Sequence, residues 1–249
     1  MKFTESSTNY TYPLPTVTLA YFLRYPNPYA RHVLSSDVLS RHVDPGNARL
    51  HTTRLHLKKS KVPSAIMRFL PTGLAGPGGS SQSFILEEST IDLNEGWMET
   101  ESRNMEWTGI LSVVEKQVYR RYEANIGDDG KVLDWTNCKT TVTFTSKLGQ
   151  AKALKKRTLP EEREEVEGVP KQGFFAQWGA AGIQRTVELV GVKRTQTALV
   201  NGAKGMNVVL ERVRDGGWRG VLQGVRDDGF AVEGGWKGVW NKGQPGDDE

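Results

Sequence analysis

The sequence predicts an α+β fold, in which a curved, mainly antiparallel sheet of about seven strands and a long C-terminal helix enclose a cavity. Extended stretches separated by short Gly- and Asp-containing turns run from Ser83 to Ser146, and such connections favour antiparallel neighbours. From Phe174 to Val213 apolar residues recur at helical spacing, although glycines weaken the pattern. The long helix over Phe174 to Val213 needs a sheet to lie on. Residues 61–81 interrupt the strands with a lid loop.

The chain suits one large domain with appendages, since domains commonly run to roughly 100–200 residues and this one has 249. We place the N-terminal part of the domain at residues 1–156 and its closing helix at residues 174–214. Residues 157–173 are Glu-rich, contain prolines and almost lack large apolar groups, which predicts a disordered acidic insert. Residues 215–249 contain ten glycines and repeat a Gly-Gly-Trp motif, which predicts a flexible Gly/Trp tail.

The first elements lead into a proline-rich corner. Residues 2–12 are rich in Thr, Ser, Tyr and Phe and predict a strand, and a short amphipathic helix follows from Thr16 to Leu23. Residues 24–32 then read Arg-Tyr-Pro-Asn-Pro-Tyr-Ala-Arg-His. Because a residue before proline is disfavoured in a helix, we expect the helix to stop at Arg24. The prolines stiffen the corner and fix the positions of Arg24 and His32; the alternative is a Pro-rich corner with a surface arginine.

A hairpin is predicted next, with arms Val33–Val43 and Leu50–Lys59 around an Asp-Pro-Gly-Asn turn. By the two-residue period of a strand, Arg54, His56 and Lys58 share one face of the second arm. This basic face has two interpretations. It is a solvated sheet face, or it lines a cavity and forms an anion clamp.

Residues 61–81 form the predicted lid. Residues 61–70 predict a short amphipathic helix, and a run rich in glycine, proline and serine follows it. An apolar helix next to such a glycine- and proline-rich connection is typical of a movable flap. A surface loop with one helical turn is the alternative.

The charge distribution favours an anionic ligand or surface. Residues 1–156 carry 20 basic and 15 acidic side chains, and residues 173–214 carry 6 and 2. Residues 157–172 carry 3 and 5, and residues 215–249 carry 4 and 7. The dense basic runs of a nucleic-acid-binding arm are absent from the sequence, so we expect no nucleic-acid partner.

Several functional classes lack their sequence signals. Cys138 is the single cysteine, which excludes an internal disulfide and a cysteine-built metal site, and we expect it to be buried on a strand. The four histidines show no metal-binding spacing, so we expect no metal and no cofactor. No G-x-S-x-G motif or P-loop nominates a catalytic residue, so we expect a protein that is not an enzyme. No presequence or membrane-spanning run is apparent.

Four short motifs match one known family. They are Arg24-Tyr-Pro-Asn-Pro-Tyr-Ala-Arg-His-Val-Leu-Ser-Ser-Asp37, Thr52-Thr-Arg-Leu55, Lys58-Lys-Ser-Lys-Val-Pro63 and Lys204-Gly-Met-Asn-Val-Val-Leu210. With them, the sequence resembles the PRELI-like (Ups/slowmo) family of mitochondrial intermembrane-space phospholipid transfer proteins. The resemblance covers residues 1–156 and 174–213, and the corner motif is its specific part.

The resemblance implies a cargo and a set of binding residues. The corner is similar to the branch of the family that moves phosphatidic acid, which supports cardiolipin synthesis. Arg24 is implied at the floor of a lipid cavity, where it meets the lipid phosphate. The other implied phosphate-binding residues are His32, Arg54, Lys58 and Arg194. A second basic position of the family's long helix is Asn201 here.

The family's lid corresponds to residues 61–81, and its expected role is contact with an anionic membrane surface. The expected contact residues are Lys61, Val62, Ile66, Met67, Arg68, Phe69 and Leu70. Family members form one-to-one heterodimers with a small helical protein that carries twin cysteine motifs. They lie peripherally on the inner and outer membranes and need no cleaved presequence.

Physical chemistry agrees with a covered cavity. Moving two chains of about sixteen carbons from lipid into water costs on the order of 25 kcal/mol. A phosphate cannot be buried unpaired, and arginine offers a permanently charged fork that matches its oxygens. The alternatives that stay open are phosphatidylserine transfer by the same fold and a non-catalytic module that binds anionic membranes.

Overall fold

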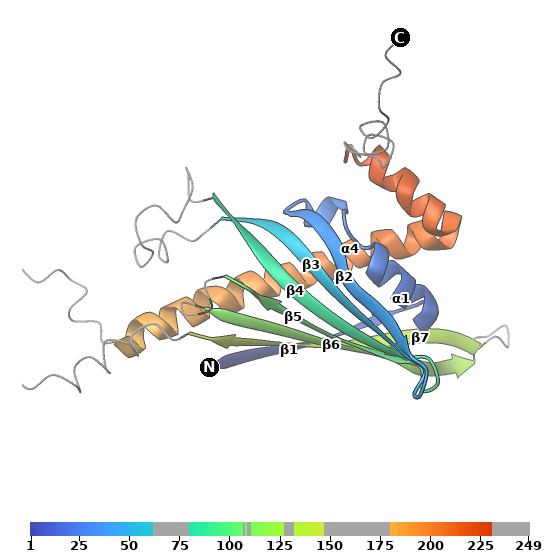
Figure 1. Ribbon diagram of the computed structural model, residues 1–249, viewed down its shortest axis with the longest axis horizontal. Coiled ribbons are helices and arrows are strands. Elements are labelled where there is room, and N and C mark those ends of the chain that lie inside the picture. Colours follow the sequence, from blue (N-terminus) through green and yellow to red (C-terminus); the bar gives the residue numbers. More distant parts are fainter. Residues whose placement is uncertain (62–79, 107, 109–110, 127–131, 147–179, 231–249) are drawn as a thin grey trace, which may run out of the picture.

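The computed structural model describes residues 1–61, 80–106, 108, 111–126, 132–146 and 180–230 (Figure 1). The predicted acidic insert 157–173 and nearly all of the predicted lid lie outside these residues. Within the described part, no helix has the length and apolarity needed to cross a membrane.

Seven antiparallel strands form one curved, open sheet, as the sequence predicts (Figure 1). The strands are β1 (Lys2–Tyr10), β2 (Val33–Asp44), β3 (Arg49–Lys61), β4 (Ser80–Asp92), β5 (Trp97–Asn104), β6 (Ser112–Ile126) and β7 (Val132–Thr145). Their order across the sheet is β1-β7-β6-β5-β4-β3-β2. The first two strands of the chain are therefore the two edges of the sheet. The α1 helix and the proline corner span the distance between them.

Helix α1 (Leu14–Leu23) begins after Pro13 and ends with Arg24 as its C-cap, where the prolines predict its end. A short 3-10 helix, η1 (Pro28–Ala30), completes the corner. The long helix α4 (Ala180–Asp227) runs along the inner face of the sheet and contacts α1, η1, β1 and β7 (Figure 1).

Helix α4 has two arms, because Gly217 breaks it with φ 58° and ψ −149°. This region of backbone space is essentially open to glycine alone. The second arm turns back from the end of the first and leads away from the sheet (Figure 1), and it buries Val221 and Val225. Over residues 215–230 the structure thus differs from the predicted flexible tail. The glycine-rich composition hides a single apolar stripe, in which the two valines lie four residues apart.

The apolar core fills one end of the space between sheet and helices. Val17, Ala20 and Tyr21 of α1 pack there with Val209 and Leu210 of α4, and all five are fully buried. The sheet contributes Met98, Tyr119 and Cys138, and burial of Cys138 on β7 is as expected. Beyond this core the helix and the sheet separate and leave a cavity.

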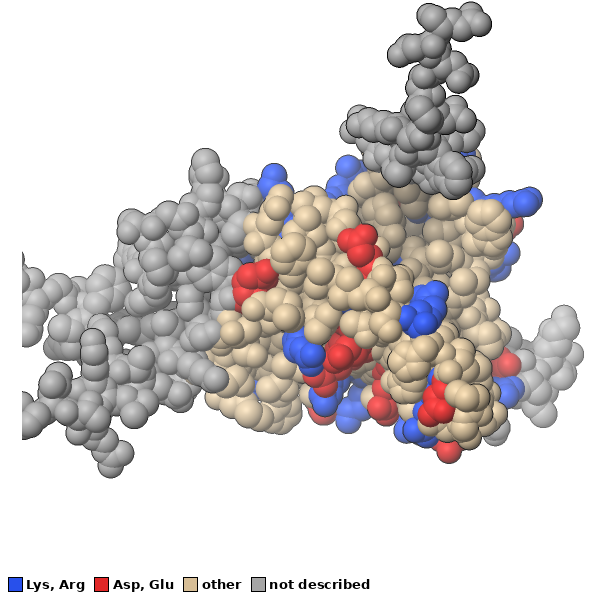
Figure 2. Space-filling view, viewed as in Figure 1, with Lys and Arg blue, Asp and Glu red and all other residues tan. Residues whose placement is uncertain are grey.

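Charged residues of both signs share the surface. Acidic and basic side chains are mixed on the face seen in Figure 2. Cross-strand ion pairs such as Glu88–Arg103 (3.2 Å) and Glu101–Lys116 (3.0 Å) occupy partly exposed positions. Such exposed pairs contribute little to stability.

Candidate ligand-binding cavity

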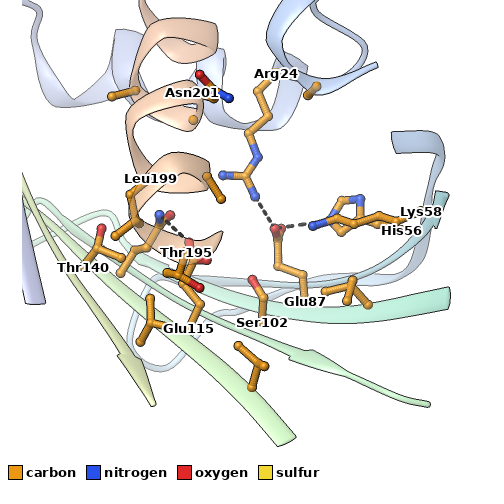
Figure 3. Close-up of a pocket in the computed structure, with 18 of the residues that line it drawn as sticks. Arg24, His56, Lys58, Glu87, Ser102, Glu115, Thr140, Thr195, Leu199 and Asn201 are labelled. Atoms are coloured by element: carbon orange, nitrogen blue, oxygen red, sulfur yellow. Dashed lines mark hydrogen bonds and ion pairs between the residues drawn. The ribbon is translucent and has the colours of Figure 1, made fainter. Parts of the chain in front are cut away.

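The cavity lies between the inner face of the sheet and α4 and has a volume of about 640 Å³. In Figure 3, Thr195, Leu199 and Asn201 face it from α4, whereas Glu87, Ser102 and Glu115 face it from the sheet. Pockets of roughly 300–1,000 Å³ hold drug-sized ligands. The described part of the cavity is therefore large enough for a substantial part of a lipid-sized molecule.

The proline corner fixes the end of the cavity through Asn27. The Asn27 side chain is buried; its Nδ2 donates to the carbonyl oxygen of Arg24 (2.6 Å), and its Oδ1 accepts from the backbone N–H of Tyr29 (2.9 Å). Gly205 of α4 packs on this amide so closely that a Cβ there would lie 2.7 Å from Oδ1. The corner, and Arg24 with it, is thus locked against the long helix.

Arg24 points from this corner into the cavity (Figure 3). Its Nη2 donates to Oε2 of Glu87 at 2.6 Å, and its side chain is 17% exposed. The guanidinium carbon lies 4.0 Å from the ring centre of Tyr21 and 4.8 Å from that of Tyr25. Two aromatic faces stabilise the cation where little water reaches it.

Glu87 of β4 is the centre of the charged cluster and is fully buried. Arg54 donates to its Oε1 through Nε (2.8 Å) and Nη2, and Nε2 of His56 lies 3.2 Å from its Oε2. Burial alone would raise the pKa of Glu87. Arg24, the His56 hydrogen bond and Arg54 outweigh burial and hold that pKa well below its usual range. Glu87 is therefore a buried carboxylate.

The two nearby histidines are neutral at pH 7. Burial lowers the pKa of His56 by more than its hydrogen bond to Glu87 raises it. Loss of hydration and the charge of Lys58 lower the pKa of His32. At neutral pH both rings are uncharged hydrogen-bonding groups.

The structure brings four of the five predicted phosphate-binding residues to the cavity wall: Arg24, His32, Lys58 and Arg194. Arg54 is 3% exposed and lies behind Glu87, with its Nη1 donating to the carbonyl oxygen of Phe22 at 3.2 Å. The Arg54–His56–Lys58 face turns inward, so the solvated-face alternative does not hold. Asn201 also lines the cavity. The side chains of the predicted lid, residues 61–70, lie outside the described residues.

Sequence reasoning missed Glu87. It faces inward from β4, between inward-facing Ile85 and Ser89, and its register partner is Arg54. An acidic residue at the inward phase of an alternating strand is the signal for it, because a carboxylate there needs a buried partner. The partner depends on the register of β3 with β4, which no local pattern specifies.

The cavity floor carries a polar row across four strands. Arg54, Glu87, Ser102 and Glu115 are successive register partners on β3, β4, β5 and β6. Oε1 of Glu115 accepts from the amide of Gln117 at 2.8 Å. Apolar residues complete the lining: Ile85, Leu111, Val113, Val142, Leu199 and Met206. An elongated ligand with an anionic end near Arg24 and apolar parts elsewhere suits this arrangement.

The chain belongs to the PRELI-like family, whose family model matches residues 15–159. The mitochondrial protein Ups1 of Saccharomyces cerevisiae is 34% identical over 158 residues, which are 57% of this chain and 86% of that protein. The Ups1 homologue of Schizosaccharomyces pombe is 33% identical over 153 residues, 61% and 80% of the two chains. The mitochondrial PRELI domain-containing protein 1 of Gallus gallus is 26% identical over 202 residues, which are 81% of this chain and 73% of that protein. The resemblance seen in the corner motif is thereby confirmed.

Proposed function

We propose that the protein carries phosphatidic acid between the mitochondrial outer and inner membranes, in support of cardiolipin synthesis. The observation that carries the proposal is the Arg24 guanidinium, which projects into the cavity between sheet and helix. Membership of the PRELI-like family, a family of mitochondrial lipid transfer proteins, supports it. In this role the protein moves its ligand without chemical change.

The phosphate binds at the Arg24 end of the cavity. Arg24 supplies a fixed positive charge and a fork of donors. Lys58 adds a second charge, His32 a hydrogen-bonding ring and Arg194 a charge from α4. Arg54 acts indirectly, because its hydrogen bonds go to Glu87 and to the backbone. A small headgroup leaves room for these contacts, which favours phosphatidic acid.

Phosphatidylserine transfer is the second candidate, and Glu115 favours it. This carboxylate lies on the cavity floor with a neutral amide as its hydrogen-bond donor. It offers an acceptor for a headgroup ammonium, which phosphatidic acid lacks. The two candidates share the fold and the Arg24 contact and differ in the second headgroup contact.

The proposed setting is the intermembrane space, with a small helical twin-cysteine protein as a one-to-one partner. Support for a protein partner comes from edge strand β2, where Leu34, Val38 and Leu39 are 49%, 52% and 58% exposed. Such a row of exposed apolar groups marks an interaction surface. The predicted lid residues are proposed to contact the anionic membrane, with Lys61 and Arg68 steering.

The test is transfer of labelled phosphatidic acid and phosphatidylserine between liposomes, with the helical partner present. We expect wild type to transfer phosphatidic acid intact and Arg24→Glu to lose transfer while it stays folded. Arg120→Glu is the matched control, since Arg120 is exposed and its neighbour Tyr119 faces inward. Normal transfer by Arg24→Glu would refute the role of Arg24. Wild-type transfer of phosphatidylserine alone would select the second candidate, and transfer of neither lipid would refute the carrier proposal.

A further inference from the structure

An anion already occupies the floor of the cavity. The Glu87 carboxylate meets Arg24, Arg54 and His56 at the point where the proposed ligand would bring its phosphate (Figure 3). Phosphate and carboxylate are alternative acceptors for the same guanidinium donors. The ligand therefore competes with a side chain of the protein.

The three partners of Glu87 are held to different degrees. Arg54 is 3% exposed and is tied by three of its nitrogens, two to Glu87 and one to the Phe22 carbonyl oxygen. His56 is 2% exposed. Glu87 thus keeps two buried partners when Arg24 moves away.

Arg24 is the exchangeable partner. It reaches Glu87 through Nη2 alone, is the most exposed of the three and lines the cavity. Its Nε is buried and has no hydrogen-bond partner within the described part of the chain. A phosphate in the cavity offers acceptors both to this nitrogen and to the terminal nitrogens.

We propose that Glu87 is a resident counter-ion that pairs with Arg24 in the empty cavity and releases it to the ligand's phosphate. This inference rests on the proposed function, in which Arg24 contacts the phosphate. Without Glu87 the empty protein would hold two buried, unpaired guanidinium groups, an unfavourable arrangement. With Glu87 present, the Arg24–phosphate pair forms only as the Arg24–Glu87 pair is lost. The free energy of ligand binding therefore reflects the difference between these two pairs, and this smaller binding free energy keeps release of the ligand fast.

Charge balance gives the direction of the effect. Arg24 and Arg54 carry two positive charges and Glu87 one negative charge, so this cluster has one net positive charge, to which Lys58 and Arg194 add theirs. Glu87→Gln keeps the shape and a carbonyl acceptor for Arg54 but leaves two net positive charges. Most affinity changes of this kind appear in the dissociation rate. The variant should bind a phosphate more tightly and release it more slowly.

The experiment measures binding and dissociation of water-soluble, short-chain phosphatidic acid by the full-length protein with its helical partner. For Glu87→Gln we expect the dissociation constant and the dissociation rate to fall by at least about tenfold, because removing one like charge within about 12 Å of the phosphate, at an effective dielectric constant of ~20, has an effect of that size or more. Vesicle-to-vesicle transfer should slow. Glu88→Gln is the matched control, because Glu88 is the next residue and its side chain is 51% exposed.

The outcomes separate the two proposals. If folded Glu87→Gln binds phosphatidic acid no more tightly than wild type, the counter-ion role is overturned and the carrier function stands. If wild type binds no phosphatidic acid, the carrier function for phosphatidic acid and the counter-ion role toward that lipid are both overturned. If Glu87→Gln does not fold, Arg54→Met/Glu87→Met takes its place, since it removes the anchored pair together and frees Arg24. The net charge of the cluster is then unchanged, so tighter binding by this variant reports the release of Arg24 alone. Partial unfolding weakens binding, so it cannot imitate tighter binding with slower release.

Discussion

Arg54 and Arg24 share one carboxylate but stand in different surroundings. Arg54 is enclosed and donates to Glu87 and to a backbone carbonyl, whereas Arg24 keeps an open side toward the cavity. A buried charge that loses its partner is much more costly than an exposed one. At the scale of single residues, Arg54 therefore serves the stability of the floor, and Arg24 is the proposed ligand contact.

Arg54→Met should lower the free energy of unfolding by about 3–5 kcal/mol, because Glu87 then loses its enclosed partner. Arg54→Met/Glu87→Met should be less destabilised than the single variant, since no carboxylate is left behind. Chemical denaturation of both variants measures the difference. Arg103→Met, at a side chain 41% exposed, is the control and should change stability by less than about 1 kcal/mol. A double variant less stable than Arg54→Met would contradict this account.

The pKa directions at the floor predict that stability falls with acidification. The folded pKa of His56 lies below its ordinary value of 6.5. The contribution of neutral His56 to the free energy of unfolding is therefore complete above pH 6.5 and is lost as pH falls through the folded pKa. The folded pKa of Glu87 lies below its ordinary 4.5, so a second loss follows below pH 4.5. Denaturation between pH 2 and 8 measures both. His56→Gln should flatten the first decline, and greater stability at pH 5 than at pH 7 would contradict the assignment.

At the scale of elements, the contact between α4 and the proline corner holds the cavity together. Gly205 meets the buried Asn27 amide, which has hydrogen bonds on both its oxygen and its nitrogen and so cannot easily yield. At Gly202, one turn earlier, an added methyl group would meet no described atom within 4 Å. The two glycines of one helix therefore face opposite packing conditions.

Gly205→Ala should lower the free energy of unfolding by about 1–3 kcal/mol, because the added methyl overpacks a rigid contact. Gly202→Ala should raise it by up to about 1 kcal/mol through helix propensity. Thermal and chemical denaturation of the matched pair provide the measurement. Equal effects of the two substitutions would show that Asn27 and α4 adjust freely.

Local patterns predicted most elements, and long-range pairing explains what they missed. Alternation in β3 placed Arg54, His56 and Lys58 on one face, and the prolines placed the end of α1 at Arg24. Local patterns did not predict the role of Glu87, because this role depends on a register partner 33 residues away. The second arm of α4 escaped notice because glycines outnumber the two valines that anchor it. Tertiary contact, rather than propensity, decides both.

At the scale of the whole molecule, the C-terminal arm is part of the domain. Val221 and Val225 are buried with the core, and Arg212 of the first arm binds Asp228 through two contacts of 3.0 and 2.9 Å. The family model ends at residue 159, so all of α4, this arm included, lies beyond the matched residues. It closes over the same core that supports the cavity.

A chain that ends at residue 214 should lose about 3 kcal/mol or more of unfolding free energy, since burial of each valine contributes about 1.5–3 kcal/mol. A chain that ends at residue 230 keeps every described contact and is the control. Urea denaturation of the two compares them directly. Equal stability would restore the prediction of a tail that does not contribute to the fold.

The strand order has a consequence for how the molecule forms. Tyr10 at the end of β1 pairs with Thr136 of β7, across most of the domain's length. During synthesis at about 5–20 residues per second, the first strand waits roughly 6–25 s for this neighbour to emerge from the ribosome. Pairings so distant in the chain also slow folding. The nascent protein therefore exists first as an incomplete ribbon, and its hollow interior takes shape only after nearly the entire polypeptide has been made.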